Sequence, residues 1–214
     1  MSSVVRALSV LHGELDACRS CPKMIGPVVH GPAMASRIFL VGQAPGPHEG
    51  AIGHPFAWTA GRTMFRWFEE ACGVPEGPFR EAIYMAAIAR CFPGKAAGGG
   101  DRKPDADEIA RCGTFLEREV KILQPTLLIL VGTLAITQAT GYDGKLVGII
   151  GTQRRVRYHG VEMDAIALPH PSGASPWHKV EPGKTLLLRA LALIDAHPEM
   201  RRTFPRGRSP RVTA

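Results

Sequence analysis

The sequence lacks the features that mark membrane and secreted proteins. No apolar run approaches the roughly 20 residues that a membrane-spanning helix needs. The opening residues have neither the basic start nor the long apolar core of a secretion signal. We therefore expect a cytoplasmic protein that does not enter a membrane. No internal repeat is visible in the sequence.

Cysteine is scarce, and its count is odd. The five cysteines stand at positions 18, 21, 72, 91 and 112. An odd number in a cytosolic chain argues against a framework of disulfides and favours a metal site or a catalytic role.

Acidic residues are absent from the last fourteen residues, which contain five arginines and supply +5 of the formal net charge of +7. We predict that residues 198–214 form a basic, flexible tail. Such a tail favours a polyanion such as nucleic acid, and a role in solubility alone is the alternative. The chain is 45% hydrophobic, which is enough for one globular domain, placed at residues 1–197.

Short apolar segments alternate with amphipathic ones along the chain. The apolar segments predict buried strands at residues 37–42, 83–89, 127–131 and 163–168. Helices are predicted at residues 4–17, 60–71, 105–123, 133–141 and 183–196, and a β-excursion at residues 147–158. This alternation predicts an α/β fold, a single domain with a central parallel sheet of about four core strands and helices on both faces.

Two glycine- and proline-rich loops follow predicted parallel strands, GQAPG at residues 42–46 and HPSG at residues 170–173. In an open α/β sheet both loops lie at the same edge, so we expect them to face one pocket. His170 stands between two prolines and is suited to donate a hydrogen bond to a fixed ligand oxygen. Its alternative role is to cap its own loop.

Four of the cysteines form a second pattern. Cys18 and Cys21 are spaced as Cys-x-x-Cys, Cys91 ends the second strand, and Cys112 lies in the helix that follows. Four thiolates from two regions of the chain suit a [4Fe–4S] cluster or a structural zinc ion. Cys91 and Cys112 could each also be small buried side chains, and we assign Cys72 to that role.

The segment between the second strand and the next helix, residues 92–104, contains three consecutive glycines and has a proline near each end. We predict a flexible surface loop. Asp105 follows it as the N-cap of a helix, with Glu108 placed for a capping box.

In combination these motifs resemble the iron–sulfur uracil-DNA glycosylases of families 4 and 5. The order is Cys-x-x-Cys, GxAPG, GxPF, a cysteine closing the second strand, a cysteine in the next helix, and HPS. The resemblance covers about residues 10–196. It implies a monofunctional hydrolase that removes uracil from single- or double-stranded DNA and leaves an abasic site, with a [4Fe–4S] cluster preferred over zinc. We expect it to act as a monomer.

The resemblance also implies roles for individual residues. Phe56 would stack on the extruded uracil, His170 would donate to uracil O2, and Gln43 would orient the attacking water. Uracil or DNA contacts are further implied for Gly42, Ala44, Pro45, His48 and Ser172. The cluster ligands would be Cys18, Cys21, Cys91 and Cys112. Trp177 and His178 are candidates for the wedge that opens the base stack, and a tryptophan packed on the surface is the alternative.

The sequence departs from the family pattern at several of these positions. Family 4 has a glutamate where this chain has Gln43, and its uracil-reading asparagine aligns with Ala87. The family 5 aspartate aligns with Thr59. Glu49 and His48 lie in the same loop and could compensate for these losses, but we interpret Glu49 as a solvated loop charge. No Arg-rich insertion is present, so we do not expect a covalent adduct.

These departures keep two other functions open. One is a non-catalytic or product-retaining binder of uracil or abasic DNA. The other is an iron–sulfur nucleic-acid module within a larger repair complex.

Overall fold

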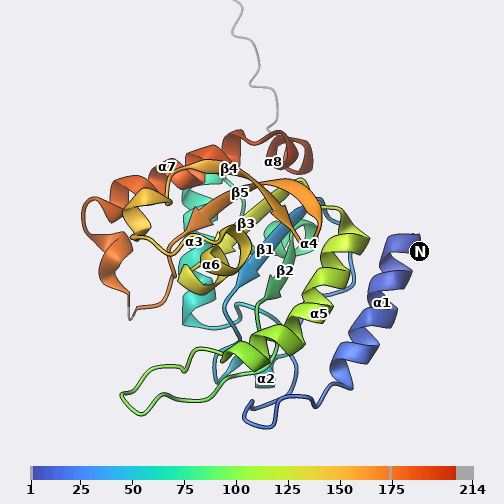
Figure 1. Ribbon diagram of the computed structural model, residues 1–214. Coiled ribbons are helices and arrows are strands. Elements are labelled where there is room, and N and C mark those ends of the chain that lie inside the picture. The colour runs from blue at the N-terminus through green and yellow to red at the C-terminus, as the bar shows by residue number, and fades with distance from the viewer. Residues whose placement is uncertain (1, 174, 206–214) are drawn as a thin grey trace, which may run out of the picture.

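A mostly parallel five-stranded sheet forms the centre of the computed structural model, which describes residues 2–173 and 175–205 (Figure 1). The strands are β1 (Ile38–Gly42), β2 (Tyr84–Ala87), β3 (Leu127–Val131), β4 (Gln153–Tyr158) and β5 (Val161–Leu168). Their order across the sheet is β2-β1-β3-β5-β4. Strands β2, β1, β3 and β5 are parallel, and β4 pairs antiparallel with β5 at the edge of the sheet.

The central strands are apolar on both faces. All five residues of β1 and of β3 are buried, as the uniform run LLILV predicted. The parallel sheet with four core strands is therefore confirmed. The predicted β-excursion is largely the edge strand β4, whose polar residues are mostly exposed.

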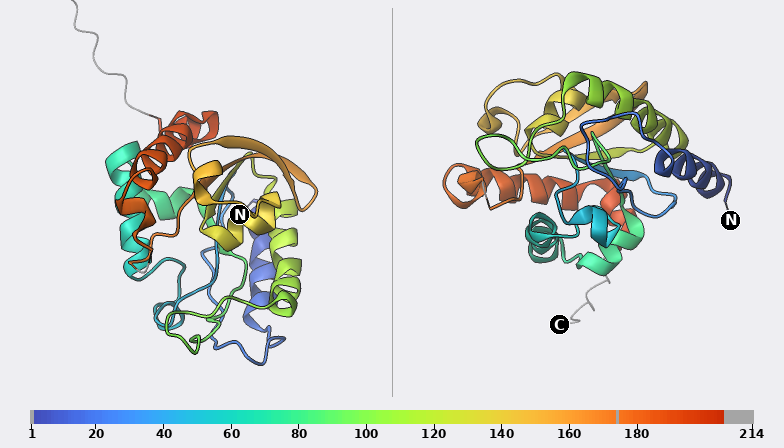
Figure 2. Two further views of the ribbon diagram at one scale, coloured as in Figure 1. Left: turned by 60° about the vertical axis from the view of Figure 1, so that its left-hand side comes forward. Right: turned by 90° about the horizontal axis from the view of Figure 1, so that it is seen from below.

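Helices cover both faces of the sheet, as predicted (Figure 2). The long ones are α1 (Ser3–Asp16), α3 (Thr59–Cys72), α5 (Ala106–Leu123), α6 (Thr133–Thr140) and α7 (Gly183–Ala196). Helices α1, α5 and α6 lie on one face, and α3 and α7 lie on the other. Asp105 and Glu108 form the predicted capping box of α5. In the described part of the chain, no helix is long and apolar enough to cross a membrane.

Three short helices were not predicted: α2 (Glu49–Ile52), α4 (Glu76–Ala82) and α8 (Pro198–Thr203). Helix α8 corrects the predicted start of the basic tail. Pro198 occupies its first turn, the His197 ring accepts a hydrogen bond from Glu199 N, and Met200 is buried against the core. The part of the predicted tail at residues 206–214 lies outside the described residues.

The glycine-rich segment at residues 92–104 is a small hairpin on the surface. Lys95 and Asp101 face each other in an antiparallel bridge, and Arg102 N donates to Gly94 O at 2.8 Å. The Arg102 guanidinium also binds both carboxylate oxygens of Glu108 in α5, at 2.7 and 2.8 Å. These contacts correct the prediction of a flexible loop, because its two stems are joined to each other and to α5.

Candidate active site

A cavity of about 500 Å³ opens at the carboxyl edge of the parallel strands. Most of the residues predicted to bind or act on substrate line it: Gly42, Gln43, Ala44, Pro45, Phe56, His170 and Ser172. The loops after β1 and β5 thus meet at one pocket, as their positions in the sequence predicted. Besides Gln43, the two other departures from the family pattern, Ala87 and Thr59, also line the cavity.

Phe56 forms one wall of this cavity in a strained backbone conformation, with φ of +54°. Its carbonyl lies so close to α3 that a Cβ on Gly61 would stand 1.7 Å from Phe56 O. Arg80 binds the same turn, because its guanidinium donates to Pro55 O at 2.9 Å and to Phe56 O at 3.0 Å. The Phe56 ring lies over Gly42, where a Cβ would come within 2.8 Å of it. These contacts fix the ring against the loop after β1.

His170 is held as a neutral hydrogen-bond donor. Its Nδ1 accepts a hydrogen bond from Ser172 N at 3.2 Å, so the neutral ring carries its proton on Nε2. Burial lowers the pKa of His170, and the nearby charge of Asp101 partly opposes this effect. The ring packs against Gly132, where a Cβ would come within 3.1 Å of Cδ2.

Glu49 is part of the loop structure, which corrects its interpretation as a solvated charge. Its side chain is buried, and its two oxygens accept hydrogen bonds from Gly46 N and from Ala57 N, the latter at 3.2 Å. The carboxylate therefore joins the GQAPG loop to the turn that carries Phe56.

Three predicted contact residues lie elsewhere. His48 is exposed outside the cavity, with its ring 4.4 Å from that of Trp58. His178 is buried and packs edge-on against Trp67 in α3, and Trp177 is half-buried against the core. The His178 side chain thus lies inside the domain and Trp177 is partly packed, and the wedge role stays a prediction for both residues.

Sequence reasoning missed several residues that shape the cavity. The hairpin at residues 92–104 brings three charged side chains to its wall, and Trp58 lies at another part of it. The charged residues are Lys95, Asp101 and Lys103. Their position after the second parallel strand was the available signal, but the glycine-rich sequence matched no motif.

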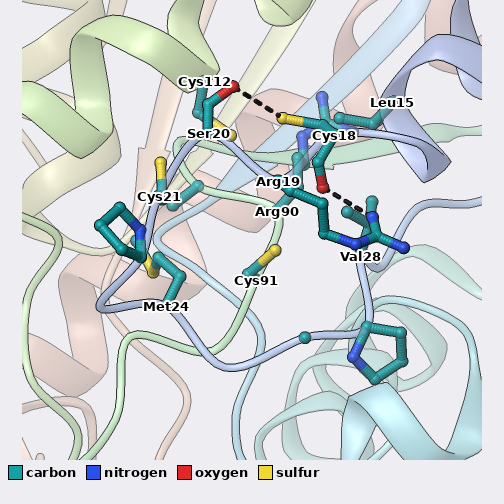
Figure 3. Close-up of a pocket in the computed structure, with 14 residues that line it drawn as sticks. Leu15, Cys18, Arg19, Ser20, Cys21, Met24, Val28, Arg90, Cys91 and Cys112 are labelled. Carbon is teal, nitrogen blue, oxygen red and sulfur yellow. Dashed lines mark hydrogen bonds between the residues drawn. The ribbon is translucent and has the colours of Figure 1, made fainter.

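A second cavity, of about 320 Å³, lies beside the first and collects all four predicted ligand cysteines (Figure 3). Cys18 and Cys21 come from the segment after α1, and Cys112 comes from α5. Cys91 lies in the segment after β2 and not in the strand as predicted, because β2 ends at Ala87. The fifth, Cys72, is buried in the main core, as predicted.

The cysteine cavity combines partly buried thiols with two arginine side chains. Burial, reinforced by the neighbouring cysteines, raises the pKa of Cys91 to about 11, and burial also raises the pKa of Cys112. A metal centre would supply the positive charge that holds these sulfurs as thiolates. Arg19 and Arg90 line the cavity, and none of the described residues lining it is acidic. Arg90 Nη1 is buried with no hydrogen-bond partner among the described residues.

Across residues 2–173 and 175–205, no three His, Cys, Asp or Glu side chains are grouped so that they could hold one metal ion. A zinc ion needs all four sulfurs at about 2.3 Å from one point. A cluster of several irons is larger and binds each cysteine at a different corner.

A network of buried polar side chains reaches this cavity through Arg90. His12 in α1 is 2.8 Å from the Tyr84 hydroxyl, which donates to Glu119 Oε1 at 2.7 Å. Arg90 binds the other oxygen of Glu119, and both side chains are almost fully buried. The network joins α1, β2 and α5 at the place where the cysteines meet.

The pattern of the Uracil DNA glycosylase superfamily matches residues 28–192 of the sequence. A type-4 uracil-DNA glycosylase from Thermotoga maritima is 28% identical over 145 residues, which are 66% of this chain and 69% of that protein. One from Archaeoglobus fulgidus is 25% identical over 166 residues, 74% of this chain and 78% of the relative. A type-5 uracil-DNA glycosylase from Pyrobaculum aerophilum is 23% identical over 143 residues, 58% and 61% of the two chains.

Proposed function

The chain belongs to the uracil DNA glycosylase superfamily, and on this basis we propose that it hydrolyses the bond between uracil and deoxyribose in DNA. The observation that carries the proposal is that Gln43, Phe56 and His170 line one cavity at the carboxyl edge of the sheet. We further propose that the protein acts as a monomer on single- or double-stranded DNA.

The cavity residues have distinct parts in this reaction. Removal of uracil from the base stack costs a few kcal/mol, and the exposed face of Phe56 offers a stacking surface for the extruded base. As the glycosidic bond breaks, negative charge develops on uracil O2. The Nε2–H of His170 stabilises that charge, and one such preorganised donor is typically worth about 3 kcal/mol. Gln43 orients the attacking water, because an amide can position water but cannot take its proton.

Lys95 and Lys103 extend the site toward the DNA backbone. Both line the cavity from the hairpin, and both side chains are exposed. Positive charge beside the pocket attracts the phosphates that flank the extruded nucleotide.

We also propose that the four cysteines of the second cavity hold a [4Fe–4S] cluster. Support comes from the four thiols around one cavity and from the buried Nη1 of Arg90, which has no hydrogen-bond partner among the described residues. The cluster would join the segment after α1 to β2 and α5, and its part would be structural. Freshly purified protein should be brown, whereas a colourless, zinc-containing protein would refute this assignment.

Excision from a uracil-containing oligonucleotide tests the proposed function. We expect alkali to cut the strand after incubation with the protein, with single-turnover rates about 100-fold lower for His170→Ala. His48→Ala is the matched control, since His48 is exposed outside the cavity, and it should act like the wild type. Tight retention of DNA without release of uracil would instead support the product-retaining binder.

A further inference from the structure

The pocket lacks a carboxylate at Gln43, yet hydrolysis of a glycosidic bond benefits from an anion near the water and the sugar. Two acidic side chains line the cavity, Glu49 and Asp101. Glu49 is buried and uses both oxygens to accept backbone hydrogen bonds. Asp101 is therefore the one carboxylate among the described lining residues that is not committed to backbone amides.

The hairpin at residues 92–104 holds Asp101 at the cavity. Its Oδ1 accepts a hydrogen bond from Lys95 Nζ at 2.6 Å, across the bridge that joins the two hairpin strands. Its Oδ2 faces the GQAPG loop, where it would be 3.8 Å from a Cβ built on Gly46. The carboxylate also acts electrostatically on His170, which lines the same cavity. Asp101 is thus near both the GQAPG loop and the base-binding histidine.

We propose that Asp101 supplies the carboxylate of the hydrolysis, in place of an acid at position 43. The inference rests on the proposed glycosylase function. The bond between C1′ and uracil N1 breaks, its electron pair leaves with uracil, and His170 stabilises the charge on O2. Water attacks C1′ and gives a proton to Asp101, from which solvent carries it to the uracil anion. The carboxylate also stabilises the positive charge that develops on the sugar.

The ion pair with Lys95 is the positioning element of this arrangement. Residues 96–100 are exposed and glycine-rich, so the hairpin tip alone does not define where Asp101 points. The ammonium group binds one carboxylate oxygen and leaves the other directed at the cavity. Because Lys95 lines the same wall, it also offsets the repulsion between Asp101 and DNA phosphates.

The test uses isosteric removal of the charge in the full-length protein. Asp101→Asn should lower the single-turnover excision rate about 100-fold or more. Its affinity for uracil-containing DNA should stay equal or increase, because a negative charge near the phosphates is lost. Asp143→Asn is the control, since Asp143 is exposed and lines neither cavity. Lys95→Met keeps the carboxylate and should slow excision at saturating protein less than tenfold.

A double variant distinguishes loss of the carboxylate's chemical role from a change in the structure of the hairpin. Gln43→Glu combined with Asp101→Asn returns a carboxylate to the pocket from the neighbouring loop and should recover at least tenfold of the lost rate. A double variant as slow as Asp101→Asn would overturn the inference, as would an Asp101→Asn protein within threefold of the wild type. Inactive wild-type protein with a correct melting transition would count against the glycosylase function itself.

Discussion

The two cavities of this protein lie side by side and share the chain that leaves β2, but they are built in different ways. Ala86 and Ala87 line the base pocket, and Arg90 and Cys91, a few residues later, line the cysteine cavity. The feature of the cysteine cavity is a single residue type, with four cysteines brought together from three segments of the chain. The base pocket combines a strained aromatic residue, a histidine of fixed tautomer and a hairpin that carries charge.

Because the two cavities are built differently, we expect substitutions in one to affect mainly stability and substitutions in the other to affect mainly the reaction rate. The cysteine cavity rests on a buried ion pair and joins α1 to the domain, so changes there should act first on folding. The base pocket is made of loops on a rigid sheet, so changes there should act first on rate. The two are coupled mechanically, since Ile88 N donates to Gly42 O and Ala89 N donates to Gln43 O, both at 3.0 Å.

Loss of one of the proposed cysteine ligands should have the largest effect, and the effect should be on stability rather than on the excision rate. Cys91→Ser should remove the visible colour of the cluster and lower the thermal midpoint by roughly 10 °C, which is about 4 kcal/mol for a chain of this size. Excision should fall only as far as the folded fraction falls. Cys72→Ser is the control and should keep the colour, because Cys72 is in the core, where its thiol faces Leu191 O at 3.8 Å. Both measurements use absorption and thermal unfolding of the same preparations.

A methyl group at Gly132 should act on rate more than on folding. Gly132→Ala places a Cβ 3.1 Å from His170 Cδ2 at a residue whose φ is +87°, so the ring must move. We expect excision to fall about 100-fold, as for a lost donor. Gly141→Ala is the matched control at the other end of α6: its φ is +68°, and a Cβ there meets nothing within 4 Å. Equal rates for the two variants would show that backbone strain alone explains the loss.

Acid should destabilise the cysteine side of the molecule through His12. Burial, with the charges of His30 and Arg90, lowers the pKa of His12 from 6.5 to about 4, while Asp16 acts in the opposite direction. As the pH falls below 6.5 the unfolded chain takes up the proton first, so stability decreases until the folded pKa is reached. Between pH 7.5 and 5 the loss should be about 2 kcal/mol. Chemical denaturation of His12→Gln should show this part of the pH dependence removed.

The smallest predicted effect concerns the cap of α5. Asp105→Ala removes the hydrogen bond to Glu108 N, which is 3.0 Å long, and should lower the free energy of unfolding by about 1 kcal/mol. The excision rate of the folded protein should not change, because the helix still presents Cys112. Chemical denaturation beside a single-turnover assay distinguishes the two quantities, and a large loss of rate would mean that the hairpin before the cap had moved.

Much of the site was predictable because it depends on local sequence. Parallel strands end at one edge of a sheet, so GQAPG and HPSG had to meet. The capping box of α5 followed from spacing in the same way, whereas the set of four cysteines was implied by the resemblance to the family. His48 and His178 show the limit of such reasoning, since the motif places a residue near the site and packing decides whether its side chain faces the cavity or the core.

The amino-acid sequence by itself determined the α/β fold and the pocket at the strand ends, because periodicity and turn chemistry act over a few residues. Only the tertiary structure decided which charges enter the pocket. Glu49 is bound to the backbone of its own loop, whereas the glycine-rich hairpin places Asp101 at the cavity, near enough to act electrostatically on His170. The physical reason is that the direction of a loop side chain depends on which pairs the folded loop brings together. Here Lys95 binds Asp101 and Arg102 binds Glu108 in α5, each six residues away, and no helix or strand repeat predicts either pair.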